Sequence, residues 1–214
     1  MSTNVETHIT TLTLSSPNKI LLQSLFPFVK GLTIQTSSKA KFHAMSVMRF
    51  SEFKKENTLT MKTIEHLIEN LTNQLQYLSK KHNHTFYRIN PQEIFVIDFS
   101  QFLYISSDDL MPLTESNEII FTRPFCKDYY ISPEIKEIAI LPSKINAKTI
   151  YYSLGSFIID LLYTFFSIKE IKGLKTTTTT TIKTIPTQIK YTKLYWFLHR
   201  ATMSTPEDRH LLFI

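Results

Sequence analysis

The stretch Ile131-Ser132-Pro133-Glu134 decides how this chain is interpreted. It closes a long polar segment, and Tyr151-Tyr152-Ser153-Leu154-Gly155 opens an apolar helical pattern about twenty residues later. A third piece, Pro206-Glu207-Asp208-Arg209, follows some fifty residues after that. Proline at the first helical position and the apolar spacing predict an extended segment, then a buried helix, then a short final helix.

The composition indicates one folded domain. Of the 214 residues, 43% are hydrophobic and 13% aromatic, which is ample for a core and argues against disorder. Only three glycines occur, so no Gly-rich phosphate loop is present in the sequence. The single Cys126 cannot form an intramolecular disulfide and fits a reducing compartment. We therefore expect an intracellular, cytoplasmic protein.

Charge and hydropathy bear on possible partners. The formal net charge is +6, but the lysines and arginines are scattered, which does not favour nucleic-acid binding as the main function. The first residues show no secretory signal. The apolar stretch 150–168 contains Asp160 and several hydroxyl side chains, so a buried helix is expected there and no membrane span.

Hydrophobic periodicity predicts an α+β fold. The strongest helix is expected over 60–81, where five apolar side chains fall on one stripe: Ile64, Ile68, Leu71, Leu75 and Leu78. Ser16 is expected to cap a short helix over 17–27. A polar break is expected at Arg49-Phe50-Ser51. The remaining predicted elements are strands over 10–15, 31–36, 41–48, 94–97 and 102–105, and helices over 150–166 and 191–203 and from Pro206.

Three further expectations follow from the pattern. The strands 94–97 and 102–105 form a hairpin with Asp98 in its turn, followed by an extended polar segment over 106–130. A low-complexity Thr/Lys loop lies near 172–190. The core contains apolar residues from the two strongest helices: Leu71, Leu75, Leu154, Ile158 and Leu161.

Five short motifs, in this order, resemble the C-terminal lobe of a protein kinase domain. Leu75 to Lys81 is similar to the end of that lobe's long helix, and Ile89-Asn90-Pro91-Gln92-Glu93-Ile94 resembles its catalytic loop. Ser132-Pro133-Glu134 resembles the alanine-proline-glutamate that closes the activation segment. Ser153-Leu154-Gly155 resembles the start of the central helix, and Pro206 to Arg209 the final proline-x-x-arginine.

The resemblance covers about 135 residues and implies a kinase-like fold. Residues 1–50 would be a reduced N-terminal strand lobe, and residues 51–214 a mainly helical C-terminal lobe. In the family, the final arginine forms a buried ion pair with the glutamate of alanine-proline-glutamate. The resemblance therefore implies an ion pair between Glu134 and Arg209.

The sequence departs from the family at the catalytic positions. Anchored on Pro91, Arg88 stands where the family has its catalytic aspartate, and Glu93 replaces the metal-binding asparagine. An arginine cannot accept the proton of a substrate hydroxyl. The aspartate-phenylalanine-glycine position falls near Ser106-Ser107-Asp108, with Asp98-Phe99-Ser100 as a rival assignment. No strand lysine to hold phosphates is visible in the N-terminal region.

The resemblance and its gaps leave three functional hypotheses. The first is a pseudokinase that binds no cofactor and acts through contacts with a protein partner. The second is a divergent serine/threonine kinase that transfers the γ-phosphate of ATP, with magnesium held by Glu93 and by Asp98 or Asp108. The third is a basic structural or nucleic-acid-associated protein. The composition, rich in Ile, Lys and Asn, resembles kinase-like proteins of large DNA viruses.

Overall fold

The computed structural model describes residues 8–170 and 184–213 of the chain, with the side chains of 168–170 excepted. The first half contains β1 His8–Thr13, α1 Lys19–Ser24, β2 Thr33–Ile34, β3 Lys39–Ala44, β4 Val47–Arg49, α2 Phe50–Glu56, α3 Met61–His82 and β5 His84–Phe86. The second half contains β6 Ile94–Ile97, β7 Gln101–Tyr104, β8 Leu110–Pro112, β9 Glu118–Phe121, α4 Pro133–Lys136, β10 Ser143–Asn146, α5 Thr149–Glu170 and α6 Lys193–Ala201. Three 3-10 turns are Pro91–Glu93, Thr187–Ile189 and Pro206–Asp208.

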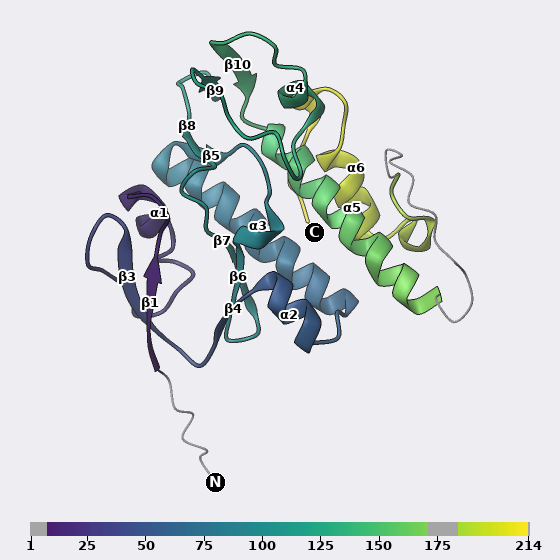
Figure 1. The fold of residues 1–214 in the computed structure, drawn as a ribbon. Helices are drawn as coiled ribbons and strands as arrows, with labels where there is room; N and C mark the ends of the chain where they lie inside the picture. Colours follow the sequence, from purple (N-terminus) through teal and green to yellow (C-terminus); the bar gives the residue numbers. More distant parts are fainter. Residues whose placement is uncertain (1–7, 171–183, 214) are drawn as a thin grey trace.

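The fold is α+β, as the sequence predicts, and its strands form small antiparallel sheets. Their strand orders are β1-β3-β2, β4-β6-β7, β5-β8 and β10-β9. The first sheet and α1 lie at one end of the molecule, apart from α5 and α6 (Figure 1). The strand β4 belongs to the sheet of the β6–β7 hairpin, so residues 1–50 contribute to two separate sheets.

The long helix α3 has a clear start and a clear end, and its predicted extent is confirmed. The hydroxyl of Thr60 accepts the backbone N–H of Thr63 at 3.1 Å, which satisfies one free donor of the first turn. Asn83 ends the helix in the left-handed conformation, with φ of 52°. Lys80, Lys81 and His82 place positive charge at the negative end of the helix dipole.

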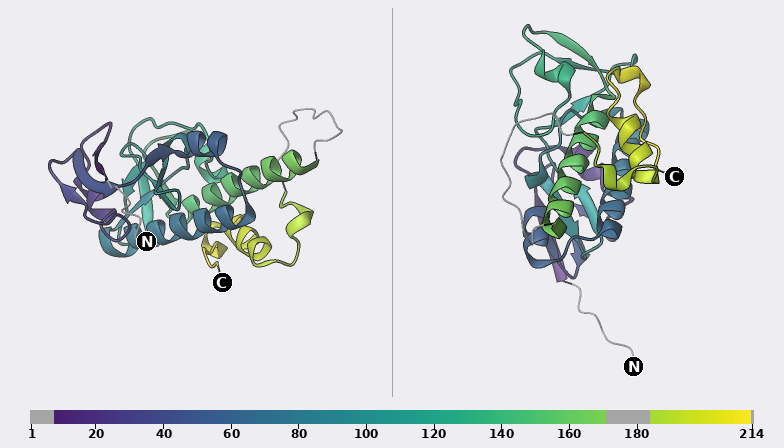
Figure 2. Two further views of the ribbon diagram at one scale, coloured as in Figure 1. Left: turned by 90° about the horizontal axis from the view of Figure 1, so that it is seen from below. Right: turned by 90° about the vertical axis from the view of Figure 1, so that its right-hand side faces the viewer.

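The β6–β7 hairpin is held on α3 by amide side chains. Gln74 donates from Nε2 to the carbonyl of Tyr104 and accepts its N–H at Oε1, both at 2.8 Å. Asn70 accepts the N–H of Phe102 at 2.8 Å. The strand β7 is at the edge of its sheet, so some of its backbone N–H and C=O groups have no partner strand. The side chains of Gln74 and Asn70 supply the hydrogen bonds that these groups need inside the fold. Figure 2 shows α3 and the strands of this hairpin from two further directions.

The N-terminal helix is shorter than predicted, because its cap differs. It begins at Lys19, and Asn18 accepts the N–H of Leu21 at 3.0 Å. The hydroxyl of Ser16, the predicted cap, instead donates to Ser107 at 2.8 Å and to Asp108 at 2.9 Å. A long-range contact that the local sequence does not reveal therefore displaces the cap by two residues.

The region 41–50 also differs from the sequence prediction. The predicted strand over 41–48 is two strands in different sheets, because the chain turns after Ala44. Arg49-Phe50-Ser51 is not a polar break. The helix α2 starts at Phe50, whose ring is fully buried and contacts Phe102 and Phe157 edge-on. The segment 106–130 contains β8 and β9, and the final helix near Pro206 is a single 3-10 turn.

The predicted core residues of α3 and α5 are all buried: Leu71, Leu75, Leu154, Ile158 and Leu161. This confirms that the apolar stripes of the two helices face the interior. The helices α5 and α6 lie next to each other (Figure 2). At Gly155 of α5, an added Cβ would stand 2.6 Å from Cγ2 of Thr202, the residue that follows α6. Glycine is therefore needed at this position for space.

Gly155→Ala is expected to lower the free energy of unfolding by about 1–3 kcal/mol, because the new methyl group overlaps Thr202. Chemical denaturation measures this change. Adding Thr202→Ser removes the clashing methyl group and should recover most of the loss. Ser156→Ala, one position along, should change stability by less than about 0.5 kcal/mol. A Gly155→Ala variant as stable as the parent would show that the two helices separate freely.

One helix of the described part, over Thr149–Ser167, is long and apolar enough to cross a membrane by length and composition, and 61% of that window is buried in the fold. A core helix meets the same criteria, so this is weak evidence for a span. The predicted Thr/Lys loop near 172–190 lies largely outside the described residues, which resume at 184 and include a 3-10 turn over Thr187–Ile189.

Candidate functional site

The three carboxylates that the sequence analysis singles out stand in different places. Glu93 and Asp98 lie at opposite ends of the β6–β7 hairpin, because Glu93 precedes β6 and Asp98 follows it. A strand of this length separates its two ends by about 13 Å. Glu93 is partly exposed and lies 3.8 Å from Nη1 of Arg49. These two carboxylates therefore cannot share one metal ion.

Asp98 is the turn residue that the sequence analysis expects. Asp98 and Phe99 both have positive φ, 50° and 59°, as a tight hairpin turn requires. Oδ1 of Asp98 accepts the backbone N–H groups of Met45 and Ser46, at 2.7 and 3.1 Å. The carboxylate therefore anchors the hairpin to the connection between β3 and β4.

Asp108 is engaged by the N-terminal segment. Its Oδ1 accepts the hydroxyl of Ser16 at 2.9 Å, and the neighbouring Ser107 contacts the hydroxyl groups of Ser15 and Ser16. These contacts bridge more than ninety residues of sequence. Within the described residues, no three His, Cys, Asp or Glu side chains gather as a metal site would need.

The carboxylate at the centre of the site is Asp109, which the sequence analysis did not single out. It is fully buried, and Oδ1 accepts Nε of Arg88 at 2.5 Å. Oδ2 accepts the hydroxyl of Tyr104 and, at 2.8 Å, that of Ser106. The spacing of Ser106 and Asp109, three residues apart, was the one available signal. It is too common a pattern to identify a buried carboxylate.

This ionic cluster joins three parts of the chain. Arg88 comes from the segment after β5, Tyr104 ends β7, and Asp109 precedes β8. The hydroxyl of Tyr104 also accepts the backbone N–H of Asn90 at 3.1 Å. The segment is further held by backbone hydrogen bonds between Ile89 and Tyr130. The position where the resemblance places a catalytic aspartate is thus a rigid, buried cation.

The protonation of the cluster is set by burial and by Asp109. Burial raises the pKa of Tyr104, and the charge of Asp109 raises it further. Burial lowers the pKa of Arg88, but the hydrogen bond that Arg88 donates to Asp109 and the negative charge of Asp109 together outweigh it and leave the pKa above its ordinary value. Both side chains therefore stay protonated at neutral pH. Asp109 already accepts hydrogen bonds from Arg88, Tyr104 and Ser106 and is fully buried, so its carboxylate is not exposed to a substrate hydroxyl.

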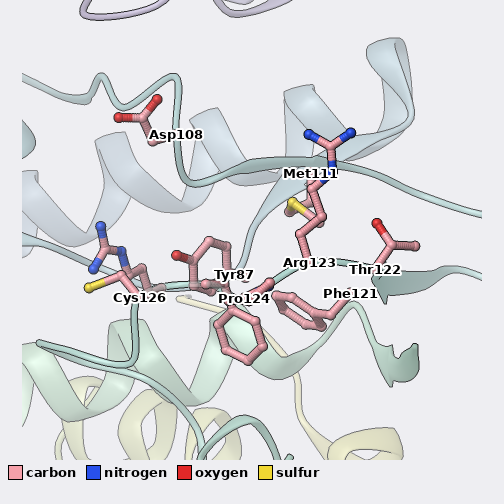
Figure 3. A pocket seen from close by; sticks show the side chains of 10 residues that line it. Tyr87, Asp108, Met111, Phe121, Thr122, Arg123, Pro124 and Cys126 are labelled. Carbon is pink, nitrogen blue, oxygen red and sulfur yellow. The ribbon is translucent and has the colours of Figure 1, made fainter. Parts of the chain in front are cut away.

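A cavity of about 450 Å³ opens beside Arg88. Figure 3 shows Tyr87, Met111, Arg123 and Cys126 around it, with Asp108 from the neighbouring segment. Its walls combine apolar and aromatic side chains with the charged side chains Arg88, Arg123 and Asp108. This volume lies within the range of small-ligand sites.

The ion pair between Glu134 and Arg209 is present, as the sequence analysis predicts. Nη1 of Arg209 donates to Oε1 of Glu134, and Nη2 donates to Oε2 at 3.1 Å. The guanidinium also donates to the carbonyls of Met203 and Ser204, at 2.7 and 3.0 Å, and lies over the ring of Tyr152. Arg209 is fully buried and links α4 to the segment after α6.

Fold and site together define an α+β protein with two buried arginine–carboxylate pairs. Comparison of the chain with models of known protein families finds no match, and comparison with curated proteins finds none either. Neither comparison adds to what the site itself indicates.

Proposed function

We propose that this protein is a kinase-like module without phosphoryl-transfer activity, which acts through contacts with a protein partner. The observation that carries the proposal is the placement of Arg88. It stands where the resemblance expects the catalytic base, and it is buried in an ion pair with Asp109. A guanidinium cannot take a proton from a substrate hydroxyl. Asp109 does not replace it as the base, because its carboxylate is held in the ion pair with Arg88.

The order of elements supports the kinase-like part of the proposal. A long helix, a loop, a hairpin and an extended segment precede the Ser-Pro-Glu turn at α4 and the apolar helix α5. The pair between Glu134 and Arg209 matches the one that the resemblance implies. A scaffold maintained by buried ionic contacts, beside a site that lacks a base, favours binding over catalysis.

The alternative of an active serine/threonine kinase needs carboxylates that converge on ATP-bound magnesium. Glu93 and Asp98 lie at opposite ends of a hairpin, and Asp108 is bound to Ser16. Nothing in this arrangement favours that alternative or a nucleic-acid-binding one.

ATP with magnesium is expected to leave the melting temperature unchanged, because the carboxylates that would hold the metal do not converge. Thermal melting with and without 5 mM nucleotide, on the order of fifty times a 0.1 mM dissociation constant, would detect such binding as about 2 kcal/mol. Incubation with labelled ATP is expected to give no phosphorylated product. A melting shift of several degrees that needs magnesium, or autophosphorylation that Glu93→Ala abolishes, would sink the proposal.

A further inference from the structure

We propose that the cavity beside Arg88 binds an oxyanion, a phosphate monoester or a carboxylate, carried on an aromatic or apolar group of a partner. The inference deepens the proposed function, on which it rests only in treating this region as a binding site. Three observations carry it: a buried guanidinium with an unsatisfied donor, the charge around the cavity, and an ordered aromatic wall.

The first observation is the incomplete hydrogen bonding of Arg88. Only 9% of its surface is exposed, and among the described residues its guanidinium bonds Asp109 through Nε alone. Nη1 is buried and has no hydrogen-bond partner in that part of the chain. A buried guanidinium normally satisfies its donors, because unpaired ones are costly. The two Nη atoms form a fork that can bind an oxyanion through two parallel bonds. Because Nη1 is covered, an anion reaches it only when a neighbouring side chain moves, and the exposed ring of Tyr129 lies over the guanidinium.

The second observation is the charge around the cavity. The Arg88–Asp109 pair is close to neutral, so an extra anion needs another cation. Arg123 lines the same cavity, is exposed, and makes no hydrogen bond or ion pair that the described residues record. Asp108 opposes an anion, although its carboxylate accepts a hydrogen bond from Ser16. Asp108→Asn should therefore tighten binding.

The third observation is the nature and order of the walls. Met111, Phe121, Pro124 and Phe125 line the cavity with apolar surface, and Tyr87 adds an aromatic face. The rings of Phe121 and Phe125 both contact Tyr87, so this wall is fixed before any ligand arrives. An anion with no apolar group would leave these walls in water. The site therefore suits an oxyanion attached to an aromatic or apolar body.

Calorimetric titration of the full chain tests the inference with small probes. Phenyl phosphate and phenylacetate represent the two possible oxyanions on one aromatic body, and the tighter one identifies the source. Inorganic phosphate should bind more weakly than phenyl phosphate, and 2-phenylethylamine, a cation on the same body, should not bind. If neither aromatic oxyanion binds at millimolar concentration, or if the amine binds as well as they do, the inference is wrong.

Variants locate the binding. Arg123→Gln removes an exposed cation that the fold does not need, and should weaken binding about tenfold, the value of one charged hydrogen bond. Lys62→Gln removes the same charge at the start of α3 and should change affinity less than about twofold. Equal weakening by both variants would show non-specific attraction and overturn the proposal.

The role of Arg88 is tested without mutating it, because replacing Arg88 would disturb the fold. Its guanidinium proton resonances in NMR spectra should shift on addition of the bound probe, and those of Arg209 should not. Unmoved Arg88 resonances at saturation would overturn the inference. The nucleotide experiment is kept separate by running it with ATP alone and with ATP and magnesium. A melting shift that needs magnesium would remove the proposed function, whereas a shift that ATP gives equally without magnesium would come from this cavity. Failure of the aromatic probes with no effect of ATP would leave the proposed function standing.

Discussion

Arg209→Ala is expected to lower the free energy of unfolding by about 3–5 kcal/mol. The side chain is fully buried and joins Glu134 to the carbonyls of Met203 and Ser204. Truncation leaves a carboxylate that is only 20% exposed without its counter-charge. Two carbonyl oxygens lose their donor at the same time. Chemical denaturation measures the loss.

The double variant Arg209→Ala with Glu134→Ala separates the pair from its surroundings. Its cost should fall short of the sum of the single costs by about 0.5–3 kcal/mol, because the second change removes the stranded charge. Glu93→Ala is the matched control, since it breaks a partly exposed arginine–glutamate pair at 3.8 Å, leaves the hydrogen bond of Arg49 to the carbonyl of Gln92 in place and should cost only about 0–1 kcal/mol. Additive single costs would mean that the two charges do not interact.

The same pair predicts a pH dependence. Burial raises the pKa of Glu134, but the hydrogen bonds and charge of Arg209, with smaller contributions from a backbone N–H and Ser132, together outweigh it and hold the pKa below its ordinary value of 4.5. Because the folded pKa lies below the unfolded one, this contribution to stability is complete above about pH 4.5 and is lost as the pH falls through the folded value. The difference in stability between the parent and Glu134→Gln should therefore shrink on acidification.

The sequence predicts those parts of the fold whose determining residues lie close together along the chain. The extents of α3 and α5, the β6–β7 hairpin and the burial of Leu75 and Leu154 follow from periodicity within about twenty residues. The Glu134–Arg209 pair spans 75 positions and was predictable only from the family resemblance at both ends. The regions that went wrong, at Ser16 and Phe50, are those where distant residues supply the partners.

The candidate site was predicted only in part for the same reason. The sequence placed Arg88 at the catalytic position, but it pointed to Asp108 and not to Asp109. Two adjacent aspartates look alike in sequence. In the fold, Asp108 is exposed beside Ser16, whereas Asp109 is buried against Tyr104. Only the paths of three separate segments decide which aspartate meets Arg88.

Asp109→Asn is the second change with a large expected effect, about 3–5 kcal/mol of unfolding free energy. The amide keeps the size of the carboxylate and one acceptor oxygen for the hydroxyl groups of Tyr104 and Ser106. It removes the charge that balances Arg88, which is itself 9% exposed. The loss of unfolding free energy should therefore measure the cost of leaving the buried charge of Arg88 without its counter-charge. Chemical denaturation of the full chain gives its size.

Removing both charges should reverse most of that loss. Arg88→Met with Asp109→Asn leaves no buried ion, and replacing a buried pair by neutral side chains of similar volume is often close to neutral in stability. Asp108→Asn, one position earlier, is the matched control and should cost less than about 1 kcal/mol, because its carboxylate is exposed and Ser16 can still donate to the amide oxygen. If the double variant were as unstable as Asp109→Asn, the loss would come from the hydroxyl contacts and not from Arg88. The ion pair between Arg88 and Asp109 would then contribute little to the stability of the fold.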